Sequence, residues 1–220
     1  MRPLPERPEQ TFRQRLDVTP ETDPAVLRRW GVTDCDRVDR RNLTRGLTRL
    51  QDSEAPPPAD PASLVRHIRR RYHRALITLI EDAVELATAC EAAHSGKACW
   101  PHGLSDRLAR LLEVLEAHQQ REDAVVFPML LQGRPGATNA ACLMTSEHAE
   151  LRALLDATLS VTRGFEIPPE ACARWRLLYL LCRKIDFDAR EQMRLEESGL
   201  FPPDIRDSTE GCICSAATFG

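Results

Sequence analysis

The chain has 220 residues, of which 42% are hydrophobic and 29% are charged, and its formal net charge is −3. This length and hydrophobic content suit one substantial core plus a small accessory module. The slight negative charge argues against a general attraction to nucleic acid or to an anionic membrane. Residues 1–9 carry prolines and charges in place of a signal-peptide core, and no apolar run reaches the roughly 18 residues that span a bilayer. We therefore expect a cytoplasmic protein.

The first quarter of the chain predicts a leader and a small module. Residues 1–18 are polar and rich in proline, which predicts a disordered leader. Residues 19–52 carry short amphipathic patterns and predict a small helical module, in which Gly31 ends the first helix. Cys35 has no partner thiol in this module, so a structural role is favoured. The arginine-rich run over 37–49 is typical of a solvated helix face.

A linker and a tail flank the main domain. Residues 53–61 contain three consecutive prolines and predict a semi-rigid linker. Residues 62–204 predict the main domain, and residues 205–220 predict a flexible tail, in which Cys212 and Cys214 are expected to be inert thiols rather than ligands or reductants. Four of the other five cysteines lie in helical, apolar contexts where a thiol behaves as a small hydrophobe: Cys90, Cys142, Cys172 and Cys182. Their spacing fits neither a zinc ribbon nor a secreted disulfide scaffold.

The main domain is all-α by its hydrophobic periodicity. Apolar residues recur at helical spacing and predict four long helices, over 63–93, 104–131, 139–163 and 170–196. Ser63 is the expected N-cap of the first helix. Loops with glycine and proline, at 95–103 and 133–136, separate the first three helices.

A histidine and a glutamate on the second predicted helix suggest a metal site. His118 and Glu122 are four residues apart, so they share one helix face about 6 Å apart along the axis. An imidazole and a carboxylate together suit iron, which takes both nitrogen and oxygen donors. Such a pair alone is more often part of a solvated surface. However, Gln192 and Glu196 lie 74 residues after this pair, with the same Phe-Pro dipeptide following each pair at the same distance.

The same repeat extends to the histidines upstream of each pair. His73 and His148 are 75 residues apart, and each precedes a run of apolar residues at helical spacing. His67 faces another direction and is expected at the surface or behind the site. We interpret the pattern as a duplicated helical hairpin that forms a four-helix bundle. Inward carboxylates are costly to bury unless paired or bound to metal, so Glu122 and Glu196, on opposing helices, are expected to bridge two metal ions.

These motifs resemble a known family. Residues 64–203 resemble the hemerythrin-like di-iron domain of the repair-of-iron-centres (RIC, ScdA-type) family, through segments 71–73, 118–128, 146–148, 168–172 and 195–202. Segment 27–35 is similar to that family's small N-terminal domain. The resemblance implies a hemerythrin-like four-helix bundle with a non-haem di-iron centre. It also implies a role in restoring iron–sulfur clusters damaged by nitric oxide or peroxide, with nitric oxide as a ligand of the centre.

The resemblance also implies a set of iron ligands, with both glutamates as bridges: His73, His94, His118, Glu122, His148 and Glu196. The family's last histidine falls on Gln192, a weaker donor, which predicts lower affinity for one iron unless Asp188, one turn earlier, substitutes. His94 would lie about 30 Å from His73 on a straight helix, so either the helix bends or His94 is not a direct ligand. Glu147 or Glu150 is expected to orient an imidazole.

Three functions remain open from the sequence. The leading hypothesis is a di-iron protein of cluster repair, whose partners are nitric oxide and damaged iron–sulfur proteins, with neither nucleic acid nor membrane as a partner. The second is a carrier or buffer of nitric oxide or dioxygen that donates no iron. The third is a metal-depleted bundle that acts as a regulator. The family resemblance also allows a homodimer, although Cys35 lacks the adjacent cysteine typical of the family's N-terminal domain.

Overall fold

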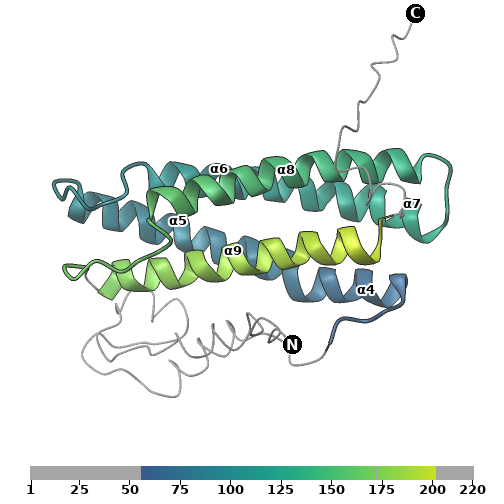
Figure 1. Cartoon of the computed structure of the whole chain (residues 1–220), viewed down its shortest axis with the longest axis horizontal. Coiled ribbons are helices and arrows are strands. Elements are labelled where there is room, and N and C mark those ends of the chain that lie inside the picture. The colour runs from purple at the N-terminus through teal and green to yellow at the C-terminus, as the bar shows by residue number, and fades with distance from the viewer. Residues whose placement is uncertain (1–55, 172, 202–220) are drawn as a thin grey trace, which may run out of the picture.

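The computed structural model of the chain describes residues 56–171 and 173–201, which are coloured in Figure 1. The predictions for the leader, the N-terminal module, the tail and Cys172 lie outside these residues, as do those for the first part of the linker. Throughout the described part of the chain all regular structure is helical. The all-α prediction is therefore confirmed.

All four predicted long helices are present, and two of them contain a π-helical turn. The first comprises α4 (Pro61–Ile68), the π-turn η1 (Arg69–His73) and α5 (Arg74–His94). The second comprises α6 (Leu104–Arg121), the π-turn η2 (Glu122–Val126) and α7 (Phe127–Leu131). The third is α8 (Ala137–Val161) and the fourth is α9 (Ala173–Gly199).

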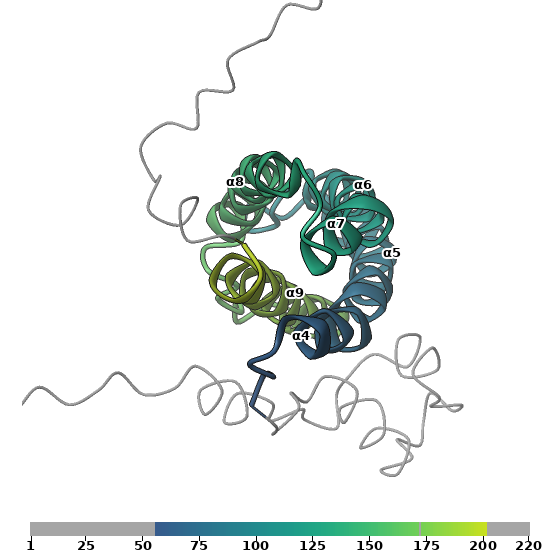
Figure 2. The same cartoon turned by 90° about the vertical axis from the view of Figure 1, so that its right-hand side faces the viewer.

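The helices form a closed ring. Contacts run from α5 to α6, from α6 to α8, from α8 to α9 and from α9 back to α5. Figure 2 shows this ring end-on, with α4 beside α9 and α7 beside α6 at the near end. Each helix turns an apolar stripe inward, and one fully or almost fully buried leucine from each illustrates the core: Leu76, Leu108, Leu155 and Leu178. Burial of each such side chain stabilises the fold by about 1.5–3 kcal/mol.

The first helix begins earlier than predicted. Asp60 is the N-cap: its backbone is extended and its carboxylate accepts a hydrogen bond of 2.8 Å from the Ser63 backbone amide. Pro61 occupies the first helical position, where a missing amide hydrogen costs nothing. The prediction of Ser63 as N-cap is wrong because the helix is already under way at that residue. The Ser63 hydroxyl instead accepts a hydrogen bond from Arg66.

Glycines set the starts of two other helices. Gly103 and Gly136 precede α6 and α8 with φ angles of 74° and 86°, in the left-handed region that glycine adopts without strain. They end the two loops that the sequence predicts. None of the described helices combines the length and apolar character needed to cross a membrane.

Candidate metal centre

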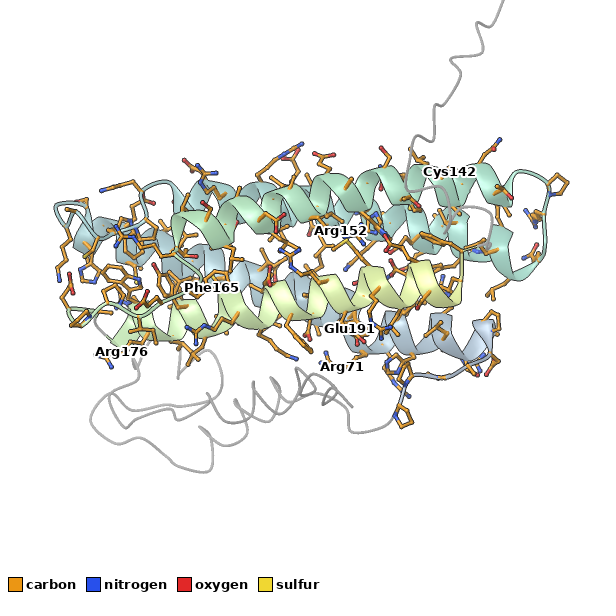
Figure 3. All side chains as sticks on the ribbon, in the orientation of Figure 1. Arg71, Cys142, Arg152, Phe165, Arg176 and Glu191 are labelled. Carbon is orange, nitrogen blue, oxygen red and sulfur yellow. The ribbon has the colours of Figure 1, made fainter. Side chains whose placement is uncertain are left out.

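Six of the predicted site residues meet inside the bundle. His73 comes from η1, His118 from α6 and Glu122 from its continuation in η2. His148 comes from α8, and Gln192 and Glu196 come from α9. All six side chains are nearly or completely buried. In Figure 3, Arg71, Arg152 and Glu191, each within four residues of one of them, share one level along the bundle. The duplicated hairpin therefore places both copies of its motif around a common centre.

Two imidazoles and two carboxylates form a compact donor group. Nε2 of His118 lies 3.5 Å from Oε1 of Glu122, and Nε2 of His148 lies 3.1 Å from Oε2 of Glu196. The two imidazole ring centroids are 4.9 Å apart. One donor atom from each of the four residues lies within 4.8 Å of the other three. We call these four residues the His118–His148 group.

A second group lies on the other side of Glu122. Nε2 of His73 is 3.3 Å from Oε2 of Glu122, and the amide nitrogen of Gln192 donates to the same oxygen at 3.4 Å. We call His73 and Gln192, together with this oxygen, the His73–Gln192 group. The Glu122 carboxylate thus faces one donor group with each of its oxygens, as a bridging ligand would.

The inward atoms of the centre are unsatisfied. Among the described residues, no hydrogen-bond partner exists for Nε2 of the three histidines, Oε1 of Glu122 and Gln192, or either oxygen of Glu196. A buried polar atom without a partner costs free energy, and most such atoms in proteins are paired. Here they converge on one place, and all of them are donors that iron accepts. The residues therefore fit a bound metal cation.

The outward nitrogen of each histidine contacts a second carboxylate. Nδ1 of His118 lies 2.9 Å from Glu147, as predicted for that acid, and Nδ1 of His148 lies 2.8 Å from Glu197. Nδ1 of His73 is 3.4 Å from Asp123. Such outer partners fix the tautomer of a metal-binding histidine and keep its other nitrogen directed at the metal. Glu150, the other predicted candidate, instead pairs with Arg110 at the surface.

Sequence reasoning missed Asp123 and Glu197, although a signal for them existed. Each directly follows a predicted bridging glutamate, and the two are 74 residues apart, like those glutamates. The structure also extends each histidine–carboxylate pair to an arginine, at 2.7 Å in all three cases. These arginines are Arg69 on Asp123, Arg121 on Glu147 and Arg152 on Glu197.

Comparison with known proteins places this centre in a family. The family model described as the hemerythrin HHE cation binding domain matches residues 64–203. Proteins named iron-sulfur cluster repair protein YtfE, from Salmonella typhimurium strain LT2, Salmonella paratyphi B and Salmonella newport, are each 35% identical over 153 residues. The match covers 69% of this chain and 68% of each relative. The chain belongs to the hemerythrin HHE family.

The two glutamates at the centre of this hemerythrin domain have pKa values that are shifted in opposite directions. Burial, reinforced by the negative charge of Glu196, raises the pKa of Glu122 well above its ordinary value. Burial alone would raise the pKa of Glu196 as well, but the close contact with His148 outweighs it and the pKa is lowered. For His148, burial would lower the pKa, but the contacts with Glu196 and Glu197 prevail and raise it. In the metal-free centre a proton is therefore held more tightly by Glu122 than by Glu196.

Outside the centre, the hemerythrin domain holds three residues that the sequence had linked to it. His94 ends the 21-residue α5, about 30 Å from His73, and its ring lies 5.3 Å from Trp175 and 6.0 Å from Trp100. The structure thus does not bring His94 to the other predicted ligands, because α5 does not fold back. His67 is buried and packs edge-on against Tyr72.

Asp188 is also held away from the donor groups. Its carboxylate accepts a hydrogen bond of 2.7 Å from the buried Lys184 and two of 3.2 Å from Arg71. Two cationic partners compensate its burial, and a metal ligand role would break both contacts. The proposed substitution of Asp188 for the missing histidine therefore has no support in the geometry.

Proposed function

We propose that this chain repairs iron–sulfur clusters damaged by nitric oxide or peroxide in the cytoplasm, and that it does so with a non-haem di-iron centre. One observation carries the proposal: the two oxygens of Glu122 face two different groups of unsatisfied buried donors. Two positions joined by a carboxylate are the arrangement that bundle-core di-iron sites use. The relatives are named iron-sulfur cluster repair protein, which supports the same function.

The chain supplies donors, orientation and shielding. His118, His148, Glu122 and Glu196 would hold one iron, and His73, Gln192 and Glu122 the other. When bound, ferrous iron supplies a Lewis-acidic, redox-active position that takes nitric oxide as a ligand. The three outer carboxylates keep Nε2 of each histidine directed inward. The site side chains are nearly or completely buried, and Phe127 and Phe201 stack on His73 and His148, so bulk water is excluded and every charge interaction at the centre is strengthened.

In the repair reaction iron is also cargo. A damaged cluster has lost or altered its iron, so the acceptor is an iron–sulfur protein that takes a ferrous ion from this chain. The contacts that place the centre all come from a single chain, so a homodimer is compatible with the function and unnecessary for the site.

The test is anaerobic reconstitution of the purified protein with ferrous iron, followed by metal analysis and by transfer of isotopically labelled iron to an apo-ferredoxin. We expect two irons per chain and restored cluster absorbance in the acceptor. His148→Ala should remove the iron and the transfer together. Retention of both irons without transfer would favour the carrier hypothesis. Failure to bind any iron would favour the metal-depleted regulator.

A further inference from the structure

The two donor groups on either side of Glu122 are chemically unequal. The His118–His148 group has two imidazoles and two carboxylates, all buried and within 4.8 Å of one another. The His73–Gln192 group has one imidazole, one amide and one oxygen of Glu122. An amide oxygen is a neutral donor suited to harder ions, whereas ferrous iron is bound well by imidazole. The second position therefore lacks the donor that the internal repeat would put there.

Gln192 is also not arranged for coordination. Its amide nitrogen, which cannot bind a metal, donates to Glu122 at 3.4 Å, and its oxygen has no partner among residues 56–171 and 173–201. The nitrogen contact uses the Glu122 oxygen that this position shares with His73, so the amide competes with a metal ion for that oxygen. Asp188, one turn earlier, does not take the place of Gln192, because it is held by Lys184 and Arg71.

The outer carboxylate contact that orients the histidine is also weaker at the second position. The outer contact of His73, to Asp123, is 3.4 Å long, against 2.9 Å and 2.8 Å for the other two histidines. The Asp123 side chain is 45% exposed, whereas that of Glu147 is 14% exposed. His73 and Glu122 both stand on π-turns, while His148 and Glu196 stand on regular α-helix. Single π-turns inside α-helices often occur at functional sites.

We propose that the chain binds its two metal ions with unequal affinity, which rests on the di-iron function proposed above. The first ion occupies the His118–His148 group and stays there. The second occupies the His73–Gln192 group, exchanges readily, and is the iron that passes to an acceptor. Glu122 belongs to both positions, so release of the second ion leaves the first with its full set of donors.

The test is an anaerobic titration of the metal-free full-length chain with ferrous iron against a chromophoric chelator. We expect two steps, the second at least about tenfold weaker, since loss of even an outer partner of a ligand costs about 10–100-fold in affinity. Gln192→His should strengthen the second step about tenfold or more and leave the first unchanged. Gln192→Leu should abolish the second step alone.

Gln119→Leu is the matched control, because Gln119 is a buried glutamine of α6 outside both groups. It should preserve both steps, and circular dichroism shows whether each variant folds. Two equal steps in the wild type, or a Gln192→His variant with unchanged affinities, would overturn the inference and leave the di-iron proposal standing. A chain that binds no metal in any form would overturn the di-iron proposal itself.

A separate observation concerns the outer surface of the segment that bears His73. Residues 66–74 contain five arginines and no acid, in a chain whose net charge is −3. Arg69 and Arg71 pair with Asp123 and Asp188. The other three are exposed, stand four residues apart and form no ion pair with any described residue: Arg66, Arg70 and Arg74. We call these three the arginine stripe.

We infer that the arginine stripe docks the acidic face of a protein partner. Like charges four residues apart on a helix repel, so the stripe weakens the isolated fold, and an acidic partner would relieve that repulsion. Complementary charge also speeds association. The stripe lies on the outer side of the turn whose inner side holds His73, so a docked acceptor would lie beside the weaker metal position. A long nucleic acid is a less suitable partner, because it would also contact the rest of this chain, whose net charge is negative.

The test is binding of a labelled acidic apo-ferredoxin to the full-length chain, measured by fluorescence anisotropy at low and high salt. We expect Arg70→Gln/Arg74→Gln to weaken binding about tenfold or more at low salt, with both metal-binding steps unchanged. The control Arg107→Gln/Arg134→Gln removes two other exposed arginines and should bind like the wild type. Equal losses in both variants, or tighter binding to duplex DNA or anionic vesicles than to the ferredoxin, would overturn the docking surface.

Discussion

Each of the three histidines of the candidate centre is the inner end of a chain of three side chains. An arginine holds a carboxylate, the carboxylate contacts Nδ1 of the histidine, and Nε2 is left for the metal. The arginine contact and the histidine contact together keep Glu147 and Glu197 ionised, since their pKa values are lowered although burial alone would raise them. Ligand position at this centre therefore depends on residues that do not touch the metal.

Neutralising an outer carboxylate should weaken metal binding. In Glu197→Gln the amide retains the shape but loses the charge that orients His148 and engages Arg152. We expect a loss of about 10–100-fold in affinity for the first metal ion, measured by chelator competition. Glu150→Gln is the control, because Glu150 contacts only Arg110 at the surface. Equal affinities in the two variants would show that the outer carboxylate is dispensable.

Metal affinity should increase with pH. The raised pKa values of Glu122 and His148 mean that the metal-free centre retains protons above the ordinary values of these groups, and a cation must displace them. For Glu122 the folded pKa is raised, so its contribution to metal-free stability is full below the ordinary value and is lost as pH rises through the raised one. Metal binding should therefore release protons at about pH 6, and it should stabilise the bundle more strongly at about pH 8 than at about pH 6.

Calorimetric titration in two buffers of different ionisation enthalpy measures the proton release directly. Glu196 should not add to this proton release, because its pKa is lowered. A buffer-independent binding enthalpy at the lower pH would contradict this account.

At the level of helices, amphipathic spacing predicted all four long segments, and the second ends at Leu131 as predicted. The π-turns were not predictable, because a π-turn depends on how a helix packs and not on the periodicity of its apolar residues. The start of α4 was predicted wrongly for a local reason. Both Asp60 and Ser63 are good N-cap residues, and the proline after Asp60 decides between them.

The end of α9 depends on a residue without a side chain. A Cβ on Gly199 would overlap the buried side chain of Leu64 in α4. Gly199→Ala should therefore destabilise the bundle by about 1–3 kcal/mol through overpacking, more than the gain of under about 1 kcal/mol in helix propensity. Thermal unfolding measures the effect, and Leu64→Ala in the same chain should offset the added overlap. Gly96→Ala, where a Cβ meets nothing within 4 Å, is the control and should be close to neutral.

On the scale of the whole molecule, the internal repeat carried most of the information about the site. Equal offsets between the two halves placed His73, His118, Glu122, His148 and Glu196 together, because two copies of a hairpin must present equivalent faces to one centre. Only the comparison of the two copies identifies Gln192, which stands where the repeat predicts a histidine. His94 came from family resemblance alone and has no counterpart in the repeat, and the structure puts it beside Trp175, near the start of α9.

His94 should therefore matter for stability and not for metal binding. Its ring completes an aromatic cluster in which Trp100 and Trp175 are 4.8 Å apart, and both indoles are buried. Such ring pairs contribute about 0.5–1.5 kcal/mol, so His94→Ala should lower the free energy of unfolding by about 1 kcal/mol and leave the number of bound metal ions unchanged. His73→Ala, in contrast, should remove the second metal ion, and it should also cost some stability because the His73 ring is buried and stacks on Phe127. A His94→Ala protein that folds normally but binds one ion fewer would show that the far end of the bundle communicates with the centre about 30 Å away.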